Sequence, residues 1–172
     1  MISKLKIENL TTFQDIHLKF SSKLNVIIGS NGIGKTHLLK AIYGLGLAGQ
    51  SLEPEQVASA SNKFARIFTP EESRLGALHT KGVVAGTKLS LVNGDGSAVS
   101  VSFGSRSKLF KISEIAKLSP HSGKPVFIPA KEVMSLVHGM CNSNYDRKTV
   151  EAIFDDGFMD LAELLVCPGF ED

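Results

Sequence analysis

Apolar and polar residues alternate in several short runs of this chain, and these runs predict strands. Two of them open the sequence, at residues 2–7 and 16–20, and we expect a pair of strands joined through residues 9–14. A third alternating stretch, 87–103, is divided by Asn93-Gly94-Asp95-Gly96, a sequence typical of a tight turn. The first half of the pattern therefore predicts antiparallel pairs of strands.

Helical spacing of apolar residues predicts the remaining regular elements. Leu38, Leu39, Ile42 and Leu45 indicate one helix, and Leu109, Ile112, Ile115 and Ala116 indicate a short one within 107–118. Residues 149–166 carry the same spacing and predict one or two closing helices. Between the first helix and residue 61 the chain is rich in Gly, Ser and Ala, which indicates a loop or a broken helix.

Two short apolar runs lack alternation and predict buried strands. Residues 24–28, Leu-Asn-Val-Ile-Ile, are rich in β-branched side chains. Residues 125–129, Pro-Val-Phe-Ile-Pro, are bracketed by prolines, which suit the ends of a strand rather than its interior.

The candidate chemistry lies directly after the first of these runs. Residues 29–36 fill every fixed position of the G-x-x-x-x-G-K-[ST] phosphate-binding loop, the Walker A motif, and we expect all eight to bind nucleotide: Gly29, Ser30, Asn31, Gly32, Ile33, Gly34, Lys35 and Thr36. Glycines let successive N–H groups point at an anion, and the following helix directs its positive dipole end toward it. Lys35 is expected at the β- and γ-phosphates and Thr36 at Mg²⁺, so ATP and Mg²⁺ are the predicted ligands.

Composition restricts the possible partners and location of the protein but identifies no further site. The 172 residues are 42% hydrophobic, enough for one domain with a sizeable core. A formal charge of +2, from 19 basic and 17 acidic residues, does not support nucleic-acid binding. A small net charge is still compatible with a basic patch on one face of the protein. The chain has no signal-peptide pattern and no run of roughly 20 apolar residues, so we expect a cytoplasmic protein without a membrane partner. Two cysteines and five scattered histidines predict neither a disulfide scaffold nor a protein-ligated metal.

The opening segment resembles the start of ATP-binding-cassette ATPases of the RecF, SMC and OLD group, which are AAA family ATPases in the broad sense. The resemblance rests on Ile2-Ser3-Lys4-Leu5-Lys6-Ile7-Glu8-Asn9-Leu10-Thr11-Thr12-Phe13, continuing to Leu24-Asn25-Val26-Ile27-Ile28-Gly29. The segment Lys124-Pro125-Val126-Phe127-Ile128-Pro129-Ala130-Lys131-Glu132-Val133 is similar to a strand and turn found midway through bacterial ATPases of this type. The likeness covers about residues 1–45 and 124–137.

This resemblance implies an α/β fold: a P-loop core, the N-terminal lobe of the cassette type, with an antiparallel β-subdomain. It also implies an LSGGQ-like signature, a Walker B strand ending in Asp-Glu and a switch histidine, and the 172 residues contain none of them. The nearest Walker B candidate, 150–156, is interrupted by Glu151 and has helical spacing. We therefore expect residues 1–172 to form a single, incomplete P-loop lobe, with the catalytic residues unknown.

Other residues have two interpretations each. His37 follows Thr36 and could face the nucleotide, but an exposed position on the first helical turn is the favoured interpretation. Phe13 could stack on the base, and a core position at the strand turn is favoured over that. Lys131 and Glu132 follow a strand end, where functional groups collect, or form a solvated helix start.

Three functions remain open from the sequence. The first is the ATP-binding lobe of an ATPase that works as a head-to-tail homodimer, or with its missing C-terminal lobe, in DNA maintenance or phage defence, as the resemblance implies. The second is a non-catalytic nucleotide-binding module that signals to a partner. The third is a small phosphotransferase; the four arginines, at 66, 74, 106 and 147, form no cluster typical of its lid. GTPase motifs are absent, so adenine is the expected base.

Overall fold

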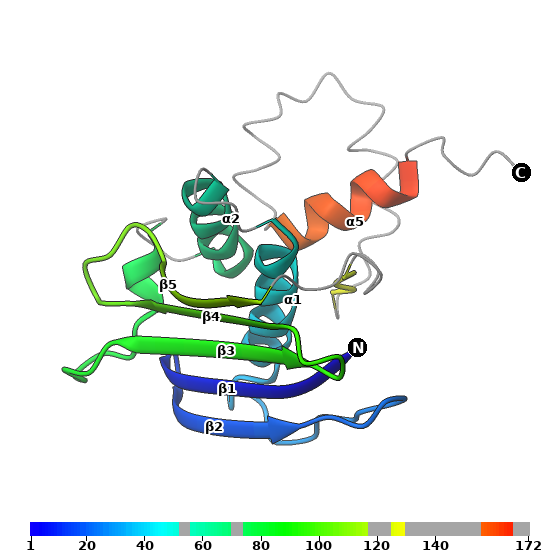
Figure 1. Ribbon diagram of the computed structural model, residues 1–172, viewed down its shortest axis with the longest axis horizontal. Helices are drawn as coiled ribbons and strands as arrows, with labels where there is room; N and C mark the ends of the chain where they lie inside the picture. The colour runs from blue at the N-terminus through cyan, green and yellow to red at the C-terminus, as the bar shows by residue number, and fades with distance from the viewer. Residues whose placement is uncertain (52–55, 70–73, 117–124, 130–155, 167–172) are drawn as a thin grey trace, which may run out of the picture. The chain divides into compact units, whose positions relative to one another are not determined.

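The computed structural model describes residues 1–51, 56–69, 74–116, 125–129 and 156–166 of the chain. The chain divides into two compact units, Met1–Pro125 and Val126–Asp172. In the first unit the described residues form a sheet and the helices packed on it (Figure 1). In the second they form the helix α5 (Asp156–Val166) and an extended segment that ends at residue 129.

An antiparallel sheet of five strands is the framework of the first unit. Its strands are β1 (Ile2–Leu10), β2 (Phe13–Lys19), β3 (Thr87–Asn93), β4 (Ala98–Phe103) and β5 (Lys111–Ala116), in the spatial order β2-β1-β3-β4-β5. The sheet confirms the predicted opening pair of strands and the predicted hairpin. Together with the helices it confirms a mixed α/β fold with an antiparallel β-subdomain.

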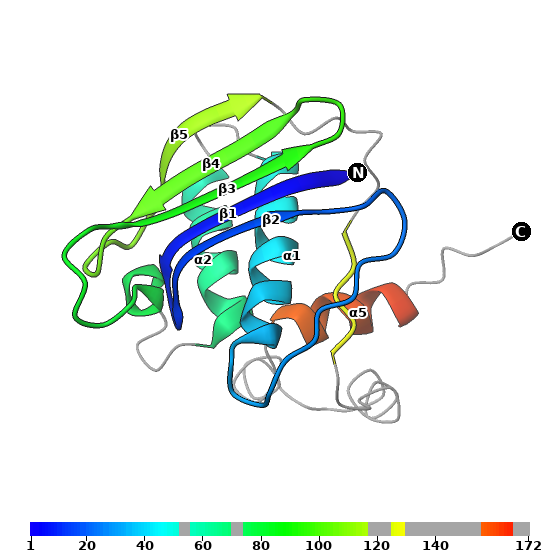
Figure 2. The ribbon, with the colours of Figure 1, turned by 90° about the horizontal axis from the view of Figure 1, so that it is seen from below.

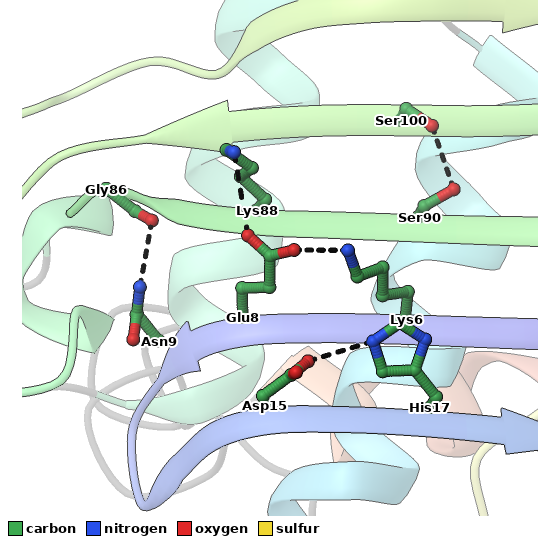
Figure 3. Close-up of polar contacts among 9 residues, drawn as sticks. All are labelled: Lys6, Glu8, Asn9, Asp15, His17, Gly86, Lys88, Ser90 and Ser100. Carbon is green, nitrogen blue, oxygen red and sulfur yellow. Dashed lines mark hydrogen bonds and ion pairs between the residues drawn. The ribbon is translucent and has the colours of Figure 1, made fainter.

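One face of the sheet is apolar and the other is polar. The register sets Ile7 opposite Leu89 and Leu89 opposite Val101, so one row of side chains on a single face joins three strands, and all three residues are buried. Burying each such side chain contributes roughly 1.5–3 kcal/mol. The opposite face carries the charged and hydroxyl side chains that Figure 3 shows, with Glu8 between two lysines and the Ser100 hydroxyl donating to Ser90 at 2.9 Å.

Two helices cover the apolar face. α1 (Lys35–Ser51) contacts β3, β4 and α2 (Val57–Phe68), and both helices lie on the same side of the sheet in Figure 2. α1 approaches α2 closely at Gly44, where an added Cβ would lie only 2.6 Å from the Phe64 ring. A short 3₁₀ helix, η2 (Leu75–Leu78), follows and contacts α2. The helix predicted from Leu38 to Leu45 is confirmed and extends to Ser51. In the stretch up to residue 61, residues 52–55 lie outside the described part, and α2 begins at Val57.

The short helix predicted within 107–118 is wrong, because residues 111–116 form β5. Ile112 and Ile115 are three residues apart, a helical spacing that a regular strand would place on opposite faces. β5 contains a register shift, so that Ile112 pairs with Val101 while Ile115 pairs with Val99. A bulge of one extra residue thus lets positions three apart on β5 pair with positions two apart on β4. Residues 117 and 118 lie outside the described part of the chain.

The two predicted buried strands are also wrong for the residues that the structure describes. Residues 24–28 form no regular element and pair with no described strand, and Leu24, Val26 and Ile28 are 80%, 74% and 87% exposed. An apolar run becomes a buried strand only when neighbouring strands and helices cover it, and the described residues supply neither. Residues 125–129 likewise form no strand there; Phe127 is buried, whereas Val126 and Ile128 are exposed.

The predicted closing helices are confirmed for 156–166, which form α5. Residues 149–155 lie outside the described part, as do Lys131 and Glu132. No helix among the described residues has the length and apolar character needed to cross a membrane.

Candidate nucleotide-binding site

The glycine-rich loop leads directly into the first turn of α1. Gly32 and Gly34 have positive φ angles of 81° and 100°, which side-chain-bearing residues adopt only with strain. At Gly34 space is also lacking, because an added Cβ would lie 2.7 Å from both Phe13 Cζ and Thr12 Oγ1. Glycine is therefore required at position 34 for two reasons, the positive φ angle and the close approach of the β1–β2 turn.

Lys35 holds the loop closed on itself. Its ammonium donates to the carbonyl oxygens of Gly29 and Ser30, each at 2.7 Å. Two of the three N–H donors are used in this way, which leaves the third donor and the positive charge for an anion. The first intrahelical bond, from Leu38 N to Gly34 O at 2.9 Å, starts α1 at this point, so the open N–H groups of the first turn adjoin the lysine.

Most of the predicted loop residues border one cavity of about 340 Å³. Its lining comprises Thr12 and six residues of the loop and first helical turn: Asn31, Gly32, Gly34, Lys35, Thr36 and His37. Gly29 and Ser30 contribute through their carbonyls to Lys35, and Ile33 is 56% exposed beside Gly29. The lining combines donors, a cation and a hydroxyl, and its volume is within the range of small-molecule sites.

A second cavity, of about 590 Å³, adjoins the first. It lies among the β1–β2 turn, the end of α2, η2 and the segment after it, and its polar lining includes Thr11, Arg74, His79 and Lys81. His37 borders both cavities, and it is the one residue in the described linings that does so. The two spaces together are large enough for a ligand with an anionic part and a second, less charged part.

His37 is held between the two cavities by contacts on two sides. Its Nδ1 lies 3.1 Å from Thr11 Oγ1, and its ring meets the Phe68 ring edge-on with the centroids 5.7 Å apart. Burial, and to a smaller extent the charge of Lys40, lower the pKa of His37 below its ordinary 6.5, so the ring is neutral near pH 7. The favoured sequence interpretation, an exposed histidine on the first turn, is therefore wrong. No local pattern indicates that the β1–β2 turn folds over this residue.

That turn is strained and tightly bonded. Asn9 and Thr11 have φ angles of 56° and 52°, and such conformations cost non-glycine residues about 1–3 kcal/mol each. Hydrogen bonds compensate: Thr11 N donates to Leu78 O at 2.7 Å, and the Asn9 amide donates to Gly86 O at 3.2 Å (Figure 3). The surroundings thus fix the Thr11 side chain against His37.

A buried histidine ties the following segment to the same turn. His79 Nδ1 lies 2.9 Å from Thr87 Oγ1 and its Nε2 lies 2.9 Å from the carbonyl oxygen of Val83. The Thr87 hydroxyl in turn donates to Asn9 O at 2.6 Å. One wall of the second cavity is therefore fixed to the turn through side chains. In the sequence, His79 is one of five scattered histidines, and its position predicts no role.

Other candidate residues lie outside the two cavity linings or outside the described part of the chain. The ring of Phe13 packs on the backbone of Gly34, with Cε1 and Cζ both close to it, and nothing described tests its stacking on a base. Asp156 begins α5, while the rest of the Walker B candidate lies outside the described residues. Within the described ranges, no group of three or more His, Cys, Asp or Glu side chains could hold a metal ion. A cation here would depend on Thr36 and on oxygens that its ligand brings.

The N-terminal part of the chain is similar to known ATPases. A family model described as AAA ATPase domain matches residues 1–72. The DNA replication and repair protein RecF of Bacillus cytotoxicus is 47% identical over 47 residues, which cover 27% of this chain and 13% of RecF. RecF of Bacillus thuringiensis is 45% identical over 47 residues, covering 27% and 12%. These matches therefore span a small part of the relatives' length.

A solved structure from work on ATP-driven dimerization and DNA-stimulated activation of SMC ATPases aligns with 94% of this chain and 96% of its own. The identity is 12% and the TM-score 0.46, a similarity too low to carry an argument. The family model does carry one, since residues 1–72 include the opening strand pair and the phosphate-loop motif. The N-terminal part of this chain, residues 1–72, is therefore similar to AAA ATPase domains, and a segment of 47 residues is similar to RecF.

Proposed function

We propose that residues 29–36 bind the triphosphate of ATP together with Mg²⁺. The observation that carries the proposal is the 340 Å³ cavity, in which Lys35 and Thr36 lie beside the open N–H groups of a helix start. Backbone donors and a lysine are suited to phosphate oxygens, and a hydroxyl is suited to a hard divalent cation. Bound Mg²⁺ would neutralise charge on the phosphates.

The individual residues have distinct tasks in this proposal. Lys35, already anchored to Gly29 and Ser30, presents its remaining N–H and its charge to the β- and γ-phosphates. Thr36 supplies a metal-ligand oxygen, and Gly32 and Gly34 keep side chains away from the phosphates. The adjoining 590 Å³ cavity takes the nucleoside, with adenine as the expected base.

In the complete protein we propose that ATP binding serves an ATPase in DNA maintenance, as in the RecF relatives named for DNA replication and repair. Head-to-tail dimerization, which the resemblance to cassette ATPases implies, is the expected way for a second copy to complete the site. A non-catalytic module that signals to a partner is the alternative. It is favoured if nucleotide binds but no second copy, and no further part of the protein, produces turnover.

Calorimetric titration with ATP and Mg²⁺ tests the binding step. Wild-type protein should bind, and Lys35→Ala should lose at least about tenfold in affinity, since hydrogen bonds to charged groups contribute about 1.5–3 kcal/mol. Lys19→Ala is the matched control: this exposed lysine lies on β2 and lines neither cavity. Equal affinity of the Lys35 variant and wild type, or no binding by either, would refute the proposal.

A further inference from the structure

We propose that His37 is a specificity residue for the sugar of the bound nucleotide, its Nε2 forming a hydrogen bond with a ribose hydroxyl. The inference rests on the proposed function, because it takes the triphosphate to occupy the smaller cavity. It goes beyond the phosphate-loop motif, which assigns no role to the side chain at this position.

Position comes from the two cavities. A nucleotide with its phosphates at Lys35 and its nucleoside in the larger cavity must pass the residue that borders both, and that residue is His37. The ribose is the part of the nucleotide that joins the phosphate chain to the base. The imidazole is therefore placed at the ribose end of the phosphate chain rather than at the γ-phosphate.

Rigidity comes from the contacts that hold the ring. Thr11 Oγ1 engages Nδ1 at 3.1 Å, Phe68 packs edge-on, and the backbone of Thr11 is itself fixed through the carbonyl of Leu78. A side chain already fixed loses little rotamer entropy on binding, so its hydrogen bond is more effective in selecting a ligand. Nε2 is the ring nitrogen left without a partner among the described residues.

Chemistry favours a hydroxyl over a phosphate oxygen as the partner. The Thr11 hydroxyl can donate to Nδ1 or accept from it, so this contact satisfies Nδ1 in either tautomer of the imidazole. Nε2 is therefore a donor in one tautomer and an acceptor in the other. A ribose hydroxyl donates and accepts and so can pair with Nε2 in both states, whereas a phosphate oxygen can only accept.

Two substitutions at position 37 distinguish the roles of the two ring nitrogens, Nδ1 and Nε2. His37→Asn places a polar atom near the position of Nδ1 and removes the group at Nε2, while His37→Gln keeps a polar group near Nε2. Affinities are measured by calorimetry on the full chain with Mg²⁺, for ATP, 2′-deoxy-ATP, 3′-deoxy-ATP and inorganic tripolyphosphate. The phosphate-loop variant Lys35→Ala is included because it should weaken all four ligands.

We expect His37→Asn to weaken ATP by about tenfold, the loss of one hydrogen bond of about 1.4 kcal/mol, while tripolyphosphate changes less than about twofold. One of the two deoxynucleotides should bind wild type about tenfold more weakly than ATP does, and His37→Asn should not distinguish it from ATP. His37→Gln should retain most of the discrimination. If His37→Asn unfolds, Thr11→Val supplies the test, because it frees the ring and should reduce the same discrimination.

Two results would overturn the inference while leaving the proposed function standing. In the first, His37→Asn weakens ATP and tripolyphosphate equally, which would assign His37 to the phosphates or to loop structure. In the second, wild type binds ATP and both deoxynucleotides alike. Failure of wild type to bind either ATP or tripolyphosphate would instead refute the phosphate-loop proposal, and the ribose contact with it.

Discussion

Phe13 and Gly34 are in direct contact, the end of the phenyl ring lying where a side chain at position 34 would begin. Phe13 opens β2 and Gly34 precedes α1, so this contact joins the antiparallel sheet to the phosphate loop. The β-subdomain therefore helps to shape the loop.

Gly34→Ala should accordingly damage both stability and binding. The Cβ would meet Phe13 Cζ at 2.7 Å and would stand on a residue with φ 100°, so we expect a loss of about 2–4 kcal/mol in the free energy of unfolding. Gly96→Ala is the control, because Gly96 has φ 85° but no atom within 4 Å of an added Cβ. It should cost only about 1 kcal/mol, the strain of the backbone angle alone. Urea unfolding of both variants measures the difference, and equal losses would contradict a steric role for Phe13.

Thr36→Ala should affect nucleotide binding through the metal. If the hydroxyl touches only Mg²⁺, the substitution should weaken Mg²⁺-ATP at least about tenfold and leave ATP in EDTA nearly unchanged. Titrations with and without the metal make the comparison. Equal losses in the two conditions would show that Thr36 contacts the phosphates or supports the loop instead.

The pH dependence of the free energy of unfolding should reflect the protonation of His37. Its pKa is lowered in the folded protein, so the unfolded chain takes up the proton first as the pH falls. The contribution of His37 is thus fully present above 6.5 and is lost as the pH falls through 6.5 toward the folded pKa. We expect the free energy of unfolding to fall less between about pH 7.5 and pH 5.5 in His37→Asn than in wild type. Parallel pH profiles would show that the ring is not desolvated.

The side chain of Ser61 should contribute more to the free energy of unfolding than most serine side chains do. It is fully buried on α2, donates to Val57 O at 2.6 Å and accepts from Phe110 N at 2.9 Å. Ser61→Ala leaves a buried N–H without its acceptor and should cost about 1–3 kcal/mol. Ser90→Ala removes a hydroxyl contact on the polar face of the sheet and should cost about 0.5 kcal/mol or less. Comparable losses would argue that the bond to Phe110 N contributes little.

Local pattern predicted the elements that form from local chemistry. The hairpin at 87–103 and the helix after residue 36 were both foreseen, because alternation, turn residues and helical spacing act over a few residues. β5 was missed, since a bulge hides its alternation and only pairing with β4 reveals it. The strand expected at 24–28 is wrong for the opposite reason: its composition is that of a strand, but burial depends on neighbours that the described residues do not include.

The site was predictable to the same extent. Motif spacing located the loop residues and the structure gathers most of them around one cavity. Spacing could not show that Thr11, 26 positions before His37 in sequence, contacts the imidazole. Such contacts depend on how the β1–β2 turn folds over α1, which no local pattern encodes.

The last prediction concerns turnover: the 172-residue chain by itself should hydrolyse ATP negligibly even at saturation. A phosphate cradle stabilises the ground state, but rate enhancement requires groups that orient water and meet the charge of the transition state. The sequence has no LSGGQ-like signature, and the one described acid of the Walker B candidate, Asp156, begins a helix rather than ending a strand.

Phosphate release, followed across a range of protein concentrations, detects any active dimer as a rise in specific activity. No turnover at any concentration, with ATP bound, is the expected result. Turnover that Asp156→Asn abolishes would show that this acid serves catalysis despite its place in α5. Turnover that survives Asp156→Asn but is lost in Lys35→Ala would instead require a water-orienting group elsewhere, because the lysine acts on the phosphates and not on the attacking water.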